Sequence, residues 1–405
     1  MFVFIAWSIG LFSICKTGNA QWIECDGPYY TYIYSLASNG ADIYAAAQNS
    51  NNADGVFRST NNGVNFIQTS LTSGINCVAV FNNKIYAGHG SWGGIYSSTN
   101  NGLNWTQSAL TGKIVFTLFV NDNIIYAGTD YASTPHCSFW YSTNNGNNWI
   151  ETNMNFAHIG SISIIGNTIL AGGGGSSGLY RSTNNGINWT INNSINQIIH
   201  CFAVSGNNVF AGTHRGGVYL STNGGNNWIQ RGLSNKVIHS IVITGNYIFA
   251  SADSSGVFLS TDNGLTWLNR NQGFNSNVMT HPLLLSNGFI FAGTYKNSVW
   301  RRSFSDIIGI RKISNEIPSA FSLNQNYPNP FNPITEIEFR LPKLSQVKLS
   351  VFNILGKEIQ TIINDKLDAC YYKSEFDGSN YSSGIYFYKI ITNEFAETRR
   401  MILVK

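Results

Sequence analysis

The stretch Ser182-Thr183-Asn184-Asn185-Gly186-Ile187-Asn188-Trp189 decides the fold, because near-copies of it recur along most of the chain. Each copy has Gly in the fifth place and an aromatic residue in the eighth. The other copies begin at Ser59, Ser98, Ser142, Ser221 and Ser260. Successive copies begin 39 to 44 residues apart, and a fixed period of this length is typical of a stacked or radial array of repeats.

The residue types of this stretch predict the turn of a β-hairpin. Strand-forming residues precede it, as in Gly217–Leu220, and a Trp with alternating residues follows. Asn or Asp in the third place can bond the backbone two residues further on. Gly in the fifth place adopts a positive φ without steric cost, and the Trp covers the turn with apolar surface.

These residues resemble the Asp-box of BNR repeats, Ser-x-Asp-x-Gly-x-x-Trp. Only Ser260–Trp267 matches the box in full, and Asn replaces the Asp in the other copies. The resemblance implies that the box is a structural device, distant from any active face. The third-place residues are Asn61, Asn100, Asn144, Asn184, Asn223 and Asp262, and the aromatic residues are Phe66, Trp105, Trp149, Trp189, Trp228 and Trp267.

Each repeat unit carries four short β patterns, and the second of them predicts the number of units. This pattern is Ile or Val, then an aromatic residue or Leu, then Ala; it begins at Ile43, Ile85, Ile125, Ile169, Val209, Ile248 and Ile290. Four strands per unit at this period predict an all-β fold, a seven-bladed β-propeller over residues 21–304. The seventh unit lacks the turn and the fourth strand. Trp22-Ile23-Glu24 stands about as far before Ile43 as Trp228-Ile229-Gln230 stands before Ile248, so we expect the N-terminal segment to supply that strand.

The beginning of the chain predicts export. Residues 1–20 have an apolar run followed by Gly18-Asn19-Ala20, which predicts a secretory signal peptide. No other stretch is long and apolar enough to predict a transmembrane span.

Charged residues make up 11% of the chain and the net charge is +4 without a basic run, which argues against a nucleic-acid partner. The cysteines form no CxxC motif, so no disulfide framework, zinc site or other cofactor is predicted.

The pattern changes after the propeller. Residues 305–320 are expected to be a linker, and six alternating runs from Phe321 onward predict a small Ig-like β-sandwich. Residues 321–405 resemble the type A sorting domain of type IX secretion cargo. The motifs that carry this resemblance are Tyr327-Pro328-Asn329-Pro330-Phe331-Asn332-Pro333, Leu341-Pro342, the run Val351–Lys357, the run Ser383–Tyr388 with Gly384, and the run Met401–Lys405.

The resemblance to sorting domains implies a route and a destination. Such a chain crosses the inner membrane by Sec and the outer membrane of a Gram-negative bacterium through the type IX machinery, which is its partner. It is then secreted or held at the outer cell surface, where the sorting domain is usually cleaved and the cargo is often anchored to lipopolysaccharide.

A ligand site is expected at the mouth of the ring, opposite the box turns. Counting back from the second pattern, His200, His239 and His281 occupy one equivalent place in blades five to seven. The equivalents in the other blades are Tyr34, Asn76, Phe116 and Gly160. The loops of the same face offer His89, Trp92, Asp130, Tyr131, His136, His214, Arg215, Asp253, Tyr295 and Lys296.

The three histidines allow two interpretations. They form a polar patch for an anion, a sugar or a metal, or tandem duplication has copied one structural histidine. Since no carboxylate or Cys stands beside them in the sequence to complete a site, we favour duplication and expect no metal site.

Three hypotheses for function follow. The first is a non-enzymatic binding or scaffold propeller that takes a glycan or a surface protein at the mouth. The second is a glycoside hydrolase of the sialidase-like type, for which Asp130 and Asp253 are the only loop-face carboxylates, although the sialidase arginine motif is missing. The third is a stable display unit. The array also resembles the photosystem-assembly propellers, which are non-catalytic, and we expect a binder without cofactors.

Overall fold

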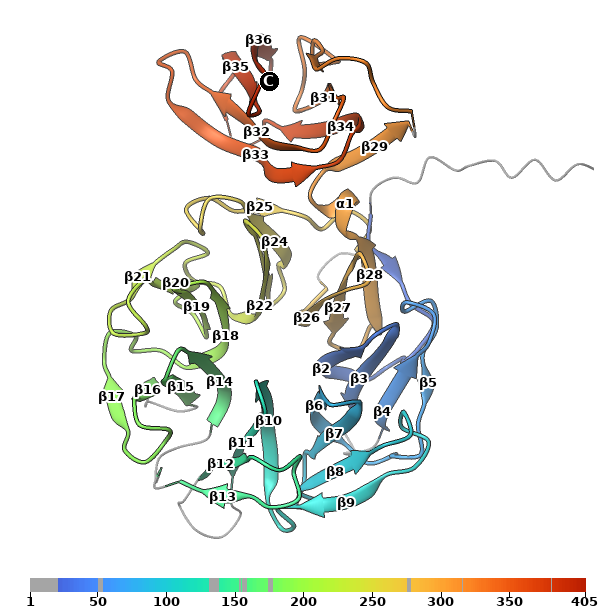
Figure 1. The fold of residues 1–405 in the computed structure, drawn as a ribbon, viewed down its shortest axis with the longest axis vertical. Helices are drawn as coiled ribbons and strands as arrows, with labels where there is room; N and C mark the ends of the chain where they lie inside the picture. Colours follow the sequence, from blue (N-terminus) through green and yellow to red (C-terminus); the bar gives the residue numbers. More distant parts are fainter. Residues whose placement is uncertain are drawn as a thin grey trace, which may run out of the picture.

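The computed structural model describes residues 21–49, 54–130, 138–152, 154, 159–173, 178–274, 278–314, 316–379 and 381–405. The predicted signal peptide, Tyr131 and His136 lie outside them. The all-β prediction is confirmed: seven four-stranded sheets surround a centre, and two further four-stranded sheets form a sandwich beside the ring (Figure 1).

The blades follow one another along the chain, each built from four antiparallel strands. Blades one to three are β2 (Tyr32–Asn39), β3 (Asp42–Gln48), β4 (Asp54–Ser59), β5 (Ile67–Gln68); β6 (Ile75–Phe81), β7 (Lys84–His89), β8 (Ile95–Ser98), β9 (Thr106–Ala109); and β10 (Ile114–Asn121), β11 (Ile124–Asp130), β12 (Ser138–Ser142), β13 (Ile150–Glu151). Blades four to six are β14 (Ile159–Ile165), β15 (Thr168–Gly173), β16 (Leu179–Ser182), β17 (Thr190–Asn192); β18 (Ile199–Ser205), β19 (Asn208–Thr213), β20 (Val218–Ser221), β21 (Ile229–Gln230); and β22 (Ile238–Thr244), β23 (Tyr247–Ala252), β24 (Gly256–Ser260), β25 (Leu268–Asn269).

Blade seven joins the two ends of the ring. Its sheet contains β26 (Thr280–Ser286), β27 (Phe289–Thr294), β28 (Val299–Ser303) and β1 (Ile23–Glu24). Ile23 pairs with Arg301, and Glu24 pairs with Trp300. The innermost strands of neighbouring blades contact one another, and β26 contacts β2. The ring is therefore closed, and the edge that β28 would otherwise expose is covered.

The second strand of each blade is buried on both faces, because its sheet packs between the two neighbouring sheets. Ile43, Tyr44 and Ala45 are all fully buried, as the predicted pattern requires. The Gly that follows this pattern in several blades has a steric cause. A Cβ on Gly88 would lie 2.4 Å from Sγ of Cys77 and 2.7 Å from Cγ1 of Val115 in the next blade. The small residues thus allow neighbouring sheets to approach closely.

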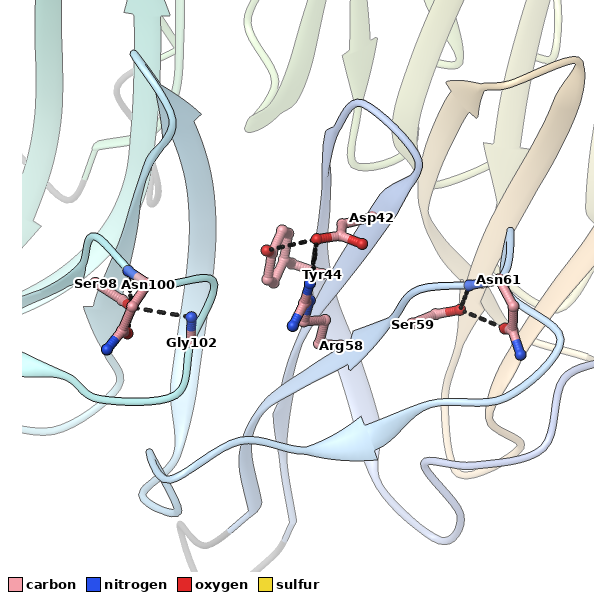
Figure 2. Close-up of polar contacts among 8 residues, drawn as sticks. All are labelled: Asp42, Tyr44, Arg58, Ser59, Asn61, Ser98, Asn100 and Gly102. Carbon is pink, nitrogen blue, oxygen red and sulfur yellow. Dashed lines mark hydrogen bonds and ion pairs between the residues drawn. The ribbon is translucent and has the colours of Figure 1, made fainter.

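The box turns connect the third and fourth strands of blades one to six. In each box the Ser hydroxyl donates to the third-place side-chain oxygen at 2.8 to 3.0 Å. The same hydroxyl accepts the Gly N–H at 2.9 Å in all six. Figure 2 shows two boxes, with the nearby ion pair between Arg58 and Asp42, whose atoms Nη2 and Oδ2 are 2.6 Å apart.

Asn serves in the box as well as Asp because the turn requires only an acceptor there. The third-place Oδ1 also accepts the backbone N–H four residues on, at 2.9 to 3.2 Å. An amide oxygen and a carboxylate oxygen both accept these bonds. The box tryptophans cover the turns: Nε1 of Trp228 donates to the Gly225 carbonyl at 3.1 Å, and Nε1 of Trp105 donates to Oγ1 of Thr69 at 3.2 Å.

The C-terminal sandwich has two more strands than the sequence predicts. One sheet contains β29 (Ile310–Ser314), β34 (Cys370–Asp377), β31 (Ile334–Leu341) and β30 (Ser322–Leu323), in that order. The other contains β33 (Glu358–Leu367), β32 (Ser345–Phe352), β35 (Gly384–Ile391) and β36 (Ala396–Leu403).

The interpretation of residues 305–320 as a linker is wrong. Helix α1 (Phe304–Ile307) and strand β29 occupy much of this segment, and β29 pairs with β34. Ile307, Ile308 and Ile310 are buried in a cluster that contains Trp22 and Phe249 of the propeller and Ile337 of the sandwich. The apolar run is too short to show a period, so its role depends on a core to which both domains contribute.

The first and last sorting-domain motifs lie against each other. The N–H of Phe331 donates to the Ile402 carbonyl at 2.9 Å, and the N–H of Val404 donates to the Phe331 carbonyl at 2.9 Å. Oδ1 of Asn329 accepts the Ile402 N–H at 2.9 Å. Lys405 donates its backbone N–H to Oγ of Ser383, beside Gly384, at 3.0 Å. The segment Tyr327–Pro333 is therefore fixed to the last strand of the chain.

Candidate ligand site at the mouth of the ring

One residue at the start of every innermost strand interrupts the pairing with the second strand. The register shifts at this point in all seven blades, as a β-bulge does. A bulge redirects a side chain away from the regular alternation of the strand. The residues within the shifts are Tyr34, Asn76, Phe116, Gly160, His200, His239 and, with Pro282, His281. The structure thus confirms that the positions aligned from the sequence are equivalent; we call them the bulge positions.

A second set of equivalent positions follows the second strand of each blade. The backbone N–H of His214, Asp253 and Tyr295 donates to the carbonyl of Ile198, Val237 and Met279, respectively, always at 3.0 Å. The register places Gln48, Gly90 and Asp130 at the same position in blades one to three. We call these the loop positions. In blades five to seven their side chains lie beside those of the bulge positions.

Four rings from the two sets, together with Tyr32 at the start of β2, form a continuous row, which we call the mouth row. The ring centroids of His200 and His239 are 5.1 Å apart, and those of His239 and His281 are 4.0 Å apart at an interplanar angle of 15°. Tyr295 lies 6.1 Å from His281 and stacks on Tyr32 at 4.0 Å. The row therefore spans blades five, six, seven and one.

Neighbouring side chains extend the mouth row at both ends. Nε2 of His200 lies 3.2 Å from Nδ1 of His214. Nζ of Lys296 lies 5.7 Å from the ring centroid of Tyr295 and 5.9 Å from that of Tyr32, within cation–π range. The row thus places half-buried aromatic rings next to imidazole nitrogens and a lysine ammonium group.

Two histidines of the row, His239 and His281, are held neutral. Burial, with a smaller contribution from the nearby imidazoles of His281, His200 and His214, lowers the pKa of His239 to about 2. Burial also lowers the pKa of His281, and the negative charge of Asp253, which raises it, only partly offsets this. A buried imidazole is costly to protonate, because the charged form loses its hydration. At neutral pH these rings therefore offer unprotonated nitrogen atoms.

The expectation that no carboxylate stands beside the histidines is wrong. The ligand atoms of His239, Asp253 and His281 all lie within 4.8 Å of one another. Oδ1 of Asp253 is buried without a hydrogen-bond partner. The sequence placed Asp253 on this face. Its proximity to the histidines results from the packing of neighbouring blades, which brings the loop position of blade six against the bulge positions of blades six and seven.

The other predicted site residues contribute less to this arrangement. Trp92 is exposed on blade two, where Nδ1 of His89 accepts the N–H of Ser91 at 2.9 Å. Arg215 follows the loop position of blade five, and its carbonyl accepts the Asn235 N–H at 3.1 Å. Asp130 occupies the loop position of blade three. In the described contacts of the mouth row, neither Trp92 nor Arg215 takes part.

Comparisons with known proteins agree with this architecture. Residues 325–405 match the model of the secretion system C-terminal sorting domain. No curated protein matches the chain by sequence. Within the described residues, no helix is both long and apolar enough to cross a membrane.

Solved structures share the fold at low identity. YCF48 from Cyanidioschyzon merolae is 12% identical with a TM-score of 0.56, covering 70% of this chain and 98% of its own. PorZ of Porphyromonas gingivalis is 14% identical with a TM-score of 0.57, covering 95% of this chain and 61% of its own. The extracellular domain of BT3049 from B. thetaiotaomicron is 13% identical with a TM-score of 0.57, covering 95% of this chain and 57% of its own. The chain thus spans little more than half the length of the last two.

Proposed function

We propose that this chain, which carries a type IX sorting domain and is exported to the cell surface or outside it, is a non-catalytic surface component that binds a glycan at the mouth of its ring. The observation that carries this proposal is the mouth row of half-buried rings. The C–H face of a pyranose packs on aromatic rings, while its hydroxyl groups bond to imidazole nitrogen atoms. A largely apolar surface with a few polar atoms is typical of small-molecule sites.

Two comparisons support a binding role. PorZ is described as an essential bacterial surface component of the type-IX secretion system. A further structure of YCF48, 13% identical with a TM-score of 0.54, is bound to a D1 peptide. Hydrolysis by two carboxylates would need a second acid beside Asp253, and Asp130, the other carboxylate at a loop position, belongs to blade three rather than six.

The proposal is tested by screening the mature chain on an array of bacterial surface glycans. Tyr295→Ala, which removes the ring between His281 and Tyr32, is expected to weaken binding of a hit at least tenfold. Trp92→Ala, an exposed ring on blade two outside the row, is expected to change it less than twofold. An equal loss in both variants, or capture of a surface protein without any glycan hit, would contradict the proposal.

A further inference from the structure

The mouth row contains a group of three side chains with the donor atoms of a metal site. His239 and His281 come from the bulge positions of neighbouring blades, and Asp253 comes from the loop position between them. Their ligand atoms lie within 4.8 Å of one another. Two imidazole nitrogens and one carboxylate oxygen form a ligand set that zinc takes in open sites, where water or a ligand completes the tetrahedron.

The separation of the three atoms is close to what a bound ion requires. Zinc–nitrogen and zinc–oxygen bonds of about 2.0 to 2.2 Å place tetrahedral ligand atoms roughly 3.3 Å apart. The widest pair in the cluster would have to approach by at most about 1.5 Å from its limit of 4.8 Å. Small side-chain rotations supply such a movement without displacing the strands. The ring planes of His239 and His281 are stacked at an angle of 15°, so one imidazole turns out of the stack when both nitrogen lone pairs point at one ion.

A buried oxygen of the carboxylate is the second observation that indicates an ion. Oδ1 of Asp253 is buried and has no hydrogen-bond partner. A buried polar oxygen without a partner is costly, and such an atom in a native structure requires an explanation. A cation between Asp253 and the two imidazoles would satisfy this oxygen.

Tandem duplication alone does not account for this group. Duplication explains a histidine at the bulge position of blades five, six and seven. The loop position, however, holds His214 in blade five, Asp253 in blade six and Tyr295 in blade seven. The carboxylate thus stands only at the middle of these three, where it can reach the bulge histidines of two blades.

We propose that His239, Asp253 and His281 bind one Zn²⁺ ion at the mouth of the ring, with a fourth coordination position open to the outside. His200 and His214 lie next to this group and line its border. The inference goes beyond the binding of a glycan and does not depend on it, since the ion is held by protein atoms alone.

The test uses the mature chain without a histidine tag, first treated with a chelator and then titrated with ZnCl₂ by calorimetry. We expect one ion per chain, an increase of Tm on binding, and no comparable binding of Mg²⁺. Asp253→Asn keeps the shape of the side chain and removes its charge, and it is expected to weaken zinc binding at least tenfold. His281→Gln is expected to weaken it still further.

Two matched controls separate this site from adventitious binding. His89→Gln removes a histidine of blade two, and Asp122→Asn removes a carboxylate from the turn between β10 and β11; both are expected to bind zinc as the wild type does. Circular dichroism establishes that each variant is folded. The proposal is overturned if the wild type binds no zinc, or if both folded variants, Asp253→Asn and His281→Gln, bind it with wild-type affinity. Either result leaves the array experiment with Tyr295→Ala unaffected.

Discussion

Two sets of repeated positions surround the ring, and they differ in how much they vary. The box turns keep Ser and Gly in all six copies, with Asn or Asp between them. The bulge positions hold Tyr, Asn, Phe, Gly and His in different blades. The geometry is equally regular in both sets, since the Ser–Gly bond is 2.9 Å long in every box and the register shifts in every innermost strand.

The difference reflects what each side chain does. A box side chain satisfies backbone groups of its own turn, so its chemistry is set by the fold. A bulge side chain points away from the strand pairing, so the fold is formed whichever residue is there. Variation at a structurally regular position therefore leaves room for a function, and the cluster of histidines in three consecutive blades is where we expect it.

The largest effect should come from blade seven, which has no box and depends on a strand from the other end of the chain. Trp22 is fully buried, its Nε1 donates to the Arg270 carbonyl at 2.7 Å, and its ring stacks on Phe274 at 4.6 Å. We expect Trp22→Ala to lower the free energy of unfolding by about 3–5 kcal/mol, as measured by urea denaturation.

The neighbouring Ile23 provides the control for blade seven. Its side chain is 56% exposed in the same strand, and Ile23→Ala should change the free energy of unfolding by no more than about 0.5 kcal/mol. Equal, small effects of both variants would mean that β1 is not required to close the ring.

Disruption of a single box should have the next largest effect on stability. Ser221→Ala leaves the buried N–H of Gly225 without its acceptor and removes the donor to Oδ1 of Asn223. An unsatisfied buried group costs about 1–3 kcal/mol, and we expect a loss of stability in that range. Ser234→Ala, an exposed Ser outside the boxes, is the control. A Ser221→Ala variant as stable as this control would show that the box hydroxyl is dispensable.

The contribution of the mouth histidines to the free energy of unfolding should depend on pH, whereas Ser and Asn of the boxes do not titrate. In the metal-free chain, His239 stays neutral until about pH 2, while the unfolded chain takes up this proton near its ordinary pKa of 6.5. The unfolded state then binds more protons below 6.5, so stability falls as the pH drops, by up to about 1.4 kcal/mol per pH unit.

Replacing the imidazole of His239 separates its contribution to the pH dependence of stability from other contributions. We expect His239→Gln to reduce the slope of stability against pH between 6.5 and 5.5 by about 1 kcal/mol per unit, measured in EDTA. Ser221→Ala should lower the whole curve and leave its slope unchanged. If the His239→Gln slope equals that of the wild type, the imidazole is not held neutral by the fold.

The sequence predicted what depends on local backbone chemistry. The box period indicated the blades, and counting from the Ile-Tyr-Ala pattern aligned the bulge positions correctly, because both follow from turn and strand geometry. Contacts between segments that are distant in sequence were missed. Strand β29 pairs with β34, which is distant from it in sequence, and Asp253 meets His281 only because blades six and seven pack side by side.

The smallest effect should come from restoring the Asp of the box. Oδ1 of Asn184 accepts from Oγ of Ser182 at 3.0 Å and from the N–H of Asn188 at 2.9 Å. Both bonds use only acceptor capacity, which Asp retains, so Asn184→Asp should change the free energy of unfolding by less than about 0.5 kcal/mol. Asn184→Ala, which removes the acceptor, should cost about 1 kcal/mol. A large loss in Asn184→Asp would mean that the amide N–H₂ is required, and that the uniform chemistry of the boxes extends beyond a single accepting oxygen.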